Sequence, residues 1–367
     1  MSQSPQPTAR PSMTDRIQNL PATLRIIIFV GGSLMALLAC VVVTVLVIVL
    51  IAYNQPRTEA VAMQEDVTIQ EFAQLPDDDA YPSSLALAED GTLYTASYQS
   101  GTVWAISPEG EVTELASTRD QIGAVIAIEI APDGTLYALD HSDPIAVQGG
   151  VLWHISGPGY LSEAVTLPVA DGATPLFFDD LAIDSDGTVY ISERVEDRIW
   201  RWQPGTDAAE SWWQAPTRDD AAQQSPGGLA YDPVNNAIVV ADAALNTLSR
   251  IPIDADDPQA ATEQIYRYIG EPENTPAFDG LTITADGTIY VTALGLNSVA
   301  RLDGDTLTYL AQGFRGSSDV AFDAGRNLLY VNNWDQSHLQ PQTVFLFFRM
   351  YVPPSLPFGI DVLSLPG

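Results

Sequence analysis

The sequence predicts an all-β protein: a six-bladed β-propeller with four-stranded blades, preceded by one transmembrane helix. Three observations lead to this prediction: a long uncharged apolar run near the N-terminus, six copies of an alternating strand–turn–strand unit, and turn residues at fixed places within the copies. The copies begin about 40 to 53 residues apart, as four-stranded propeller blades do. We expect a disordered cytoplasmic tail over 1–25, the transmembrane helix over 26–53, a stalk over 54–66 and the propeller over 67–367.

The apolar run over 26–53 contains no charged residue. As a helix it would be roughly 40 Å long, enough to cross a hydrocarbon core of about 30 Å. Arg10, Arg16 and Arg25 precede it and acidic residues follow it, a bias that predicts a cytoplasmic N-terminus and an extracytoplasmic propeller at the cell membrane. The only cysteine, Cys40, excludes an intramolecular disulfide, and the sequence leaves open whether it is a buried membrane cysteine or a lipidated one.

The six copies begin at Ser83, Ile126, Asp179, Gly227, Asp279 and Ser318. Four of them carry Asp-Gly at the turn, as tight hairpins that need positive φ require. A third and a fourth strand follow each hairpin, except that the chain ends after the third strand of the last blade. The segment Val67–Phe72, ahead of the first blade, is available as the missing strand, and closing the ring with it removes an open sheet edge.

The charge of the chain is strongly negative. Fifteen basic residues, all Arg, stand against 47 acidic ones, for a formal net charge of −32. Such a surface repels phosphate backbones and excludes nucleic acid as a partner. It attracts cations, and it suits either a salt-adapted source or an ordinary acidic secreted protein.

The repeated unit, L-A-x-D-x-D-G-T-x-Y-x-x-D, resembles the blade signature of gluconolactonase-like (senescence-marker-protein) and strictosidine-synthase-like propellers, and is similar to NHL-repeat propellers. The resemblance covers the whole region after the anchor and implies the six-bladed fold. For gluconolactonase-like enzymes it also implies a divalent metal on the propeller axis and lactone hydrolysis. Asp279, ahead of Gly280, matches one family ligand, whereas Ser83 and Gly227 stand where the family has Glu and Asn.

Polar residues gather where the innermost strands begin, at the end of the propeller that we call the top. Asp279 and Asp179 could bind a divalent cation such as calcium through oxygen, or could line a solvated channel. No residue is identified as catalytic. The other ligand-binding candidates, on the innermost strands or on the second strands that return to the top, are Glu129, Asp180, Ser318, Asp319, Asp140, His141, Glu193, Asp242, Asn332, Asn333 and Trp334.

An unusually apolar insert interrupts the last blade over 335–357, with its most apolar stretch at Val344–Val352. Loops are normally polar, so something must cover this one. It could fold over the channel mouth, form an extra hairpin, or contact a partner or the bilayer.

Three functions fit these features. The first is a membrane-anchored propeller that binds a small molecule or a protein partner through its top face. The second is a metal-dependent hydrolase of the lactonase or arylesterase type. The third is an envelope protein in which the propeller is a spacer. The loss of the family's Glu and Asn favours the first.

Overall fold

The computed structural model describes residues 17–53, 57–115, 118–119, 121–143, 149–157, 160–168, 176–216, 225–335, 342–345, 348–351 and 353–366. The chain divides into two compact units, residues 1–56 with 341–353, and residues 57–340 with 354–367. Most of the tail expected over 1–25 lies outside the described residues.

The first unit contains the predicted N-terminal helix, α2 (Ala22–Tyr53), which begins four residues earlier than the apolar run predicts. Pro21 precedes it, and the Pro21 carbonyl accepts hydrogen bonds from the amides of Leu24 and Arg25 at 2.9 and 3.1 Å. By length and composition the helix can cross a membrane. The same unit includes an antiparallel hairpin of β25 (Gln342–Phe345) and β26 (Phe348–Met350), within the apolar insert.

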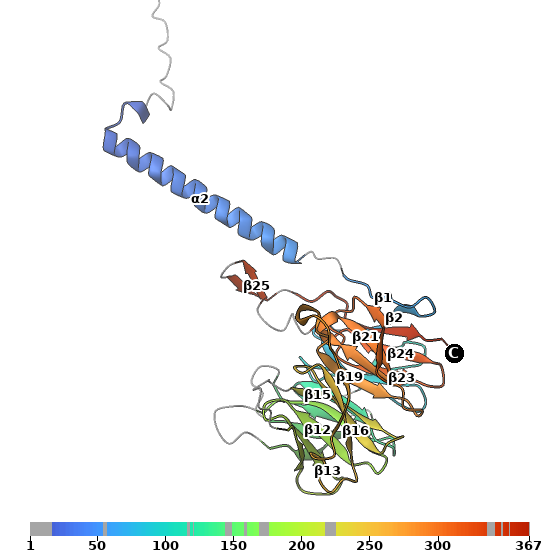
Figure 1. Cartoon of the computed structure of the whole chain (residues 1–367). Helices are drawn as coiled ribbons and strands as arrows, with labels where there is room; N and C mark the ends of the chain where they lie inside the picture. The colour runs from blue at the N-terminus through green and yellow to red at the C-terminus, as the bar shows by residue number, and fades with distance from the viewer. Residues whose placement is uncertain are drawn as a thin grey trace, which may run out of the picture. The chain divides into compact units, whose positions relative to one another are not determined.

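The second unit is a six-bladed β-propeller, which confirms the predicted fold (Figure 1). Blade 1 is β3 (Pro82–Leu87), β4 (Leu93–Ser97), β5 (Val103–Ile106) and β6 (Val112–Glu114). Blade 2 is β7 (Val125–Ile130), β8 (Leu136–Asp140), β9 (Val151–Ile155) and β10 (Leu161–Thr166). Blade 3 is β11 (Phe178–Ile183), β12 (Val189–Glu193), β13 (Arg198–Trp202) and β14 (Glu210–Gln214).

Blade 4 is β15 (Pro226–Asp232), β16 (Ala237–Asp242), β17 (Thr247–Pro252) and β18 (Glu263–Arg267). Blade 5 is β19 (Phe278–Ile283), β20 (Ile289–Ala293), β21 (Ser298–Asp303) and β22 (Thr306–Gln312), with short 3₁₀ turns η1 (Pro272–Asn274) and η2 (Leu294–Leu296) beside it. Blade 6 is β23 (Val320–Asp323), β24 (Leu328–Asn332), β27 (Gly359–Ser364) and the N-terminal strand β2 (Thr68–Gln74).

The ring closes as predicted, because β2 pairs antiparallel with β27, the last strand of the chain. One additional strand precedes it. β1 (Val61–Ala62) adds to the outer edge of blade 5 by pairing with β22. The segment expected as a stalk over 54–66 is therefore fixed to the propeller along part of its length.

The hairpin turns follow the predicted chemistry. The glycines of the four Asp-Gly turns, Gly91, Gly134, Gly187 and Gly287, have φ between +84° and +88°. In blades 4 and 6, Asn236 and Asn327 take the corresponding positive φ at +46° and +54°. Asn is one of the few residues with a side chain that tolerates this region.

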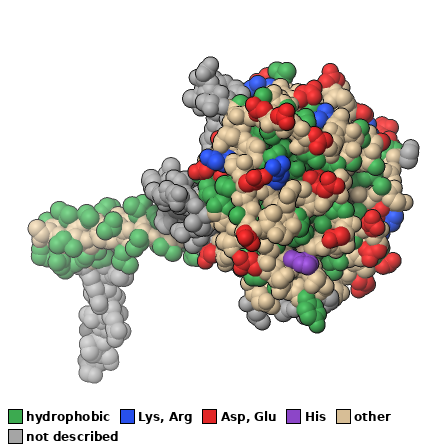
Figure 2. Space-filling model, turned by 90° about the horizontal axis from the view of Figure 1, so that it is seen from below, with side chains coloured by type: hydrophobic (Ala, Val, Ile, Leu, Met, Phe, Trp, Pro, Cys, Tyr) green, Lys and Arg blue, Asp and Glu red, His purple; other side chains and the backbone are tan. Residues whose placement is uncertain are grey.

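The core lies between neighbouring blades. Its largest fully buried side chains are Trp104, Tyr190, Tyr330, Phe178, Phe278 and Phe358. Acidic side chains, by contrast, are spread over the face of the propeller seen in Figure 2. The fold is thus held by packing between blades, whereas acidic side chains are found both on the surface and, as a smaller buried set, within the propeller.

Candidate ligand-binding channel

The axis of the propeller is lined by the innermost strands, β3, β7, β11, β15, β19 and β23. In blades 1 to 5 the pairing between the first and second strands shifts register close to the top. Such a bulge releases residues from the ladder and re-aims their side chains. The residues within these shifts are Ser83–Ser84, Ile126, Asp179–Asp180, Gly227–Gly228 and Asp279–Gly280.

Small residues allow the blades to converge at this point. A Cβ atom on Gly280 would lie 2.5 Å from the carbonyl oxygen of Ser318, and one on Gly228 would overlap the backbone of Asp279. The side chains of Ser83 and Ser318 join neighbouring blades, because Ser318 Oγ donates to the Ser83 carbonyl and Ser83 Oγ donates to the Val125 carbonyl, each at 2.8 Å. The top of the channel is consequently narrow, with a cavity of about 20 Å³ beside Asp179, Asp279 and Trp334.

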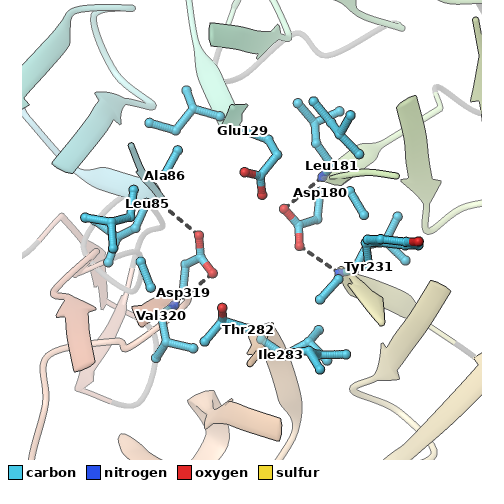
Figure 3. Close-up of a pocket in the computed structure, with 18 of the residues that line it drawn as sticks. Leu85, Ala86, Glu129, Asp180, Leu181, Tyr231, Thr282, Ile283, Asp319 and Val320 are labelled. Carbon is cyan, nitrogen blue, oxygen red and sulfur yellow. Dashed lines mark hydrogen bonds between the residues drawn. The ribbon is translucent and has the colours of Figure 1, made fainter. Parts of the chain in front are cut away.

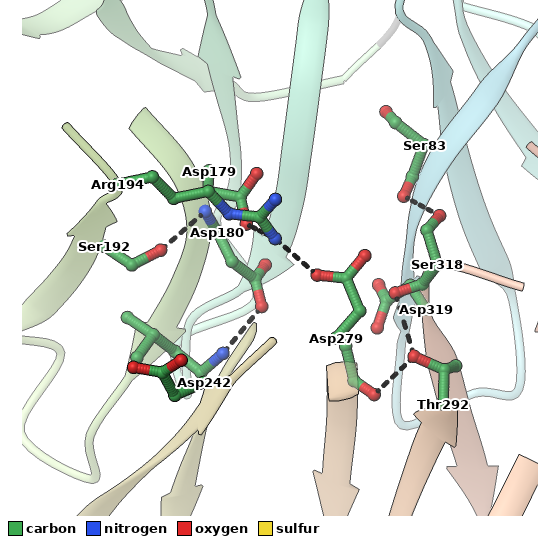
Figure 4. Close-up of polar contacts among 12 residues, drawn as sticks. Ser83, Asp179, Asp180, Ser192, Arg194, Asp242, Asp279, Thr292, Ser318 and Asp319 are labelled. Atoms are coloured by element: carbon green, nitrogen blue, oxygen red, sulfur yellow. Dashed lines mark hydrogen bonds and ion pairs between the residues drawn. The ribbon is translucent and has the colours of Figure 1, made fainter. Parts of the chain in front are cut away.

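A guanidinium group occupies the axis at the top. Arg194, which follows β12, reaches across the channel so that its Nη2 lies 2.6 Å from Asp179 Oδ2 and 2.7 Å from Asp279 Oδ1 (Figure 4). Both carboxylate side chains are 9% exposed and the Arg194 side chain is 26% exposed. One arginine nitrogen therefore bridges the two carboxylates that the sequence suggested as cation ligands.

Gly227 makes room for this bridge. A Cβ atom at Gly227 would overlap Arg194 Nη2 and lie 2.8 Å from Asp179 Oδ2. Any larger side chain at this position, including the Asn of gluconolactonase-like propellers, would have to displace the guanidinium. The glycine at residue 227 and the arginine at residue 194 are thus parts of one arrangement.

The electrostatics of the bridge are those of two buried acids sharing one cation. Burial raises the pKa of Asp279 to about 7, although the Arg194 charge acts in the opposite direction. Burial likewise raises the pKa of Asp179, again against the Arg194 charge. Desolvation disfavours the charged carboxylates, and Arg194 offsets part of that cost.

The residues at the top of the axis do not fit a resident metal ion. The space between Asp179 and Asp279 holds the Arg194 guanidinium, and Ser83 and Gly227 add no carboxylate or amide. Within the described residues, no group of three His, Cys, Asp or Glu side chains has an arrangement that could hold a metal. Calcium collects 6 to 8 oxygen ligands, which this set does not supply.

A larger cavity of about 230 Å³ lies below the bridge, toward the ends of the innermost strands. The carboxyl groups of Glu129, Asp180 and Asp319 point into it (Figure 3). Its described lining contains these three acids and no Arg or His. The volume is sufficient for several water molecules or a small ligand.

Backbone amides orient all three of these acids, and Glu129 Oε1 accepts from the Ile130 amide at 2.8 Å. Asp180 accepts hydrogen bonds from the amides of Leu181 and Leu229, each at 2.8 Å. Asp319 accepts from the amides of Val320 and Leu85, each at 2.8 Å, and from Ser84 Oγ at 2.9 Å. Asp180 and Asp319 therefore also tie their strands to neighbouring blades.

The acids of the cavity hold their protons more tightly than ordinary carboxyls. Burial raises the pKa of Glu129 to about 8 and that of Asp319 to about 7. Burial, reinforced by the charge of Asp319, raises the pKa of Asp180 well above its usual value. Near neutral pH the cavity can thus both donate and accept hydrogen bonds.

Several candidates on the second strands have a common structural task. Asp140 Oδ1 accepts from the amides of Ala124 and Ser142, both at 2.7 Å. Glu193, Asp242 and Asn332 accept in the same way from amides at the start of the innermost strand in their own blades. These four side chains stabilise the loops at the top of their blades, and they do not point into the channel.

The remaining candidates lie around the top rim. His141 is buried, with its Nε2 2.6 Å from the Phe178 carbonyl, and burial lowers its pKa to about 4. Asn333 donates to Asp361 at 2.8 Å and accepts from the Arg315 amide. Trp334 lines the narrow upper cavity and packs edge-on against Tyr98.

The fold is similar to several solved propellers, at low sequence identity. A gluconolactonase from Xanthomonas campestris is 15% identical over 85% of this chain and 99% of its own, with a TM-score of 0.56. A virginiamycin B lyase from Staphylococcus aureus is 14% identical over 82% of this chain and 100% of its own, with a TM-score of 0.53. A luciferin-regenerating enzyme is 13% identical over 82% and 96%, with a TM-score of 0.58.

These similarities confirm the predicted likeness to gluconolactonase-like propellers at the level of the fold. No protein-family model matches the sequence, and no curated protein matches it. Fold alone does not determine function, so the activity must be argued from the residues of the channel.

Proposed function

We propose that this protein is a membrane-anchored, extracytoplasmic propeller that binds a small cationic molecule in its axial channel and does not hydrolyse lactones through a metal. The observation that carries this proposal is the Arg194 guanidinium between Asp179 and Asp279. It takes the place of the catalytic cation that the fold resemblance implies, and it leaves the channel below as the space for a ligand.

The chemistry of the lower cavity supports a cationic ligand. Glu129, Asp180 and Asp319 face the same space with no basic residue in its described lining. Their raised pKa values mean that protons neutralise part of their charge near pH 7. An ammonium group entering the cavity would replace those protons, because a nearby positive charge favours the ionised carboxylate.

A propeller of this kind would act as a receptor or carrier domain outside the membrane. The apolar helix α2 supports anchoring, and the arginines ahead of it support an N-terminus in the cytoplasm. The alternative, a lactonase or arylesterase, rests on Asp279 and on fold similarity, and the bridge to Arg194 weighs against it.

Calorimetric titration of the purified full-length protein with putrescine and with tetramethylammonium tests the proposal. We expect binding to tighten as the pH rises from 6 to 8.5, with proton release, and to weaken severalfold in Glu129→Gln. Glu111→Gln, at an exposed position on the propeller surface, is the matched control. Lack of heat with either amine, together with turnover of a lactone or aryl ester, would contradict the proposal.

A further inference from the structure

The chain enters the propeller almost directly from the helix. Only residues 54–56 separate Tyr53, the end of α2, from Arg57, which pairs with Glu71 of β2. Just beyond, Val61–Ala62 pair with β22, and the Met63 amide donates to the Leu310 carbonyl at 2.8 Å. Four residue steps span at most about 14 Å, so Arg57 must lie within that distance of the helix end.

The apolar insert begins and ends at the same corner of the propeller. Arg315, whose side chain is only 4% exposed, donates from Nη1 to Asp335 Oδ2 at 2.8 Å and to the Ser355 carbonyl. Asp335 and Ser355 lie near the two ends of the insert, and together with Thr58 and Arg315 they line one cavity of about 500 Å³. Thr58, which lies where the chain enters the propeller, is therefore close to both ends of the insert.

The insert itself differs in composition from the rest of the chain. After its first residue, Asp335, the insert contains no Asp or Glu, although the protein has 47 acidic residues in 367, and its one Arg is Arg349. The hairpin β25–β26 pairs Gln342 with Met350 and Phe345 with Phe348. Beyond it, Tyr351 is 60% exposed.

This hairpin requires an apolar cover. A two-stranded hairpin is at best marginally stable alone in water, and residues 341–353 do not belong to the compact propeller unit. Aromatic side chains with a neighbouring basic residue are favoured at the boundary between lipid headgroups and acyl chains. Both ends of the insert lie beside the point where the chain enters the propeller from α2. The bilayer that α2 would cross is therefore the apolar surface within reach of the hairpin.

We propose that the β25–β26 hairpin is a second membrane contact, which inserts shallowly into the bilayer that α2 crosses. This inference rests on the membrane anchoring in the proposed function. Two attachments at one corner would restrict rotation of the propeller about the anchor and fix the direction in which its channel faces. The absence of acidic residues over 336–357 would spare the hairpin the repulsion that the acidic surface of the propeller experiences from anionic lipids.

The test uses the full-length chain in nanodiscs of phosphatidylcholine with a minority of phosphatidylglycerol, and an environment-sensitive fluorophore on a single cysteine. Native Cys40, exposed on α2, reports the anchor. Cys40→Ser combined with Phe348→Cys reports the hairpin, and Cys40→Ser with Tyr351→Cys is a second reporter in case the first perturbs the strand. Cys40→Ser with Ala208→Cys, in the exposed β13–β14 turn, is the control.

We expect the probes at residues 348 and 351 to be blue-shifted and quenched by spin-labelled lipid to an extent comparable with the Cys40 probe. The probe at residue 208 should instead be quenched by aqueous iodide alone. The inference is overturned if Cys40 is quenched by lipid while both hairpin probes behave like the control, or if they are shielded from both quenchers, as a protein cover would shield them. Loss of lipid quenching at Cys40 would instead contradict the anchoring itself.

Discussion

Arg194 changes the chemistry open to the carboxylates at the top of the axis. A guanidinium is permanently charged, planar and attached to the chain, so it pairs with both Asp179 and Asp279 and balances one of their two negative charges without exchanging with solvent cations. Gly227 provides the space it needs. A pair of acids that a divalent ion would otherwise have to stabilise is thereby stabilised by the protein itself.

Removing the arginine should leave two buried acids without a partner. We expect Arg194→Ala to cost roughly 2 kcal/mol at neutral pH, less than the ~3–5 kcal/mol of a fully buried pair because the arginine is partly exposed. The loss should shrink toward pH 5, because burial raises the pKa of both acids and protonation removes the negative charge that Arg194 balances. Denaturant unfolding at the two pH values measures it.

The matched control is Arg198→Ala in the same blade, whose exposed pair with Glu196 should contribute little. Equal losses for the two variants, or a loss that does not depend on pH, would show that the bridge has no special role.

Glu129 predicts the pH dependence of stability. Its pKa in the folded protein is raised to about 8 by burial, above its value in the unfolded chain. The folded state therefore binds the extra proton, and the stability it contributes is present below about pH 4.5 and is lost as pH rises through about 8. The melting temperature should fall between pH 5 and pH 9.

Glu129→Gln should flatten that decline, because glutamine does not titrate. Glu111→Gln at an exposed site should leave it unchanged. A Glu129→Gln protein that loses as much stability as the wild type over this range would refute the assignment.

At the residue scale the positions of the axial acids could be predicted from the sequence, but their interaction partners could not. Repeat alignment is enough to bring Asp179, Asp279 and Asp319 to the start of innermost strands. It does not reveal that Arg194 pairs with Asp279, 85 residues away, because that contact depends on how blades 3 and 5 face each other across the channel. The one available signal was an arginine at a rim position in a chain with few basic residues.

At the scale of elements, the turns and the number of strands determine the ring. The Asp-Gly pairs mark the hairpins because only residues that tolerate positive φ can occupy them. The closing strand β2 was predictable because the last blade lacked a fourth strand and propellers avoid open edges. The two-residue strand β1 was not predictable, since so short a segment carries no periodicity.

Ring closure is tested by comparing a chain that begins at Arg57 with one that begins at Ala80. The shorter chain lacks β2 and exposes the edge of β27, and it loses the contact of Phe72 with Tyr330 at a ring separation of 4.8 Å. We expect aggregation or a large fall in melting temperature, seen by light scattering and calorimetry. Equal stability of the two chains would be incompatible with the observed pairing.

At the scale of the whole molecule, the apolar helix α2 and the charges on either side of it predict on which side of a membrane the propeller lies. Arginines before α2 and acids after it predict that residues 1–25 are cytoplasmic and residues 54–367 extracytoplasmic. Protease added to spheroplasts should digest the propeller and spare an N-terminal tag. A propeller protected until the membrane is lysed would reverse the orientation.

Whether the channel is a binding site or a metal centre follows most directly from calcium titration by calorimetry, on the wild-type protein and on Arg194→Ala combined with Gly227→Asn. The wild type should purify without stoichiometric metal and show no calcium binding at the axis, because the guanidinium of Arg194 already lies between Asp179 and Asp279. The double variant should gain a calcium site, which a further Asp279→Ala abolishes. A wild-type protein that retains one tightly bound divalent ion, lost together with lactone turnover in Asp279→Ala, would contradict the account.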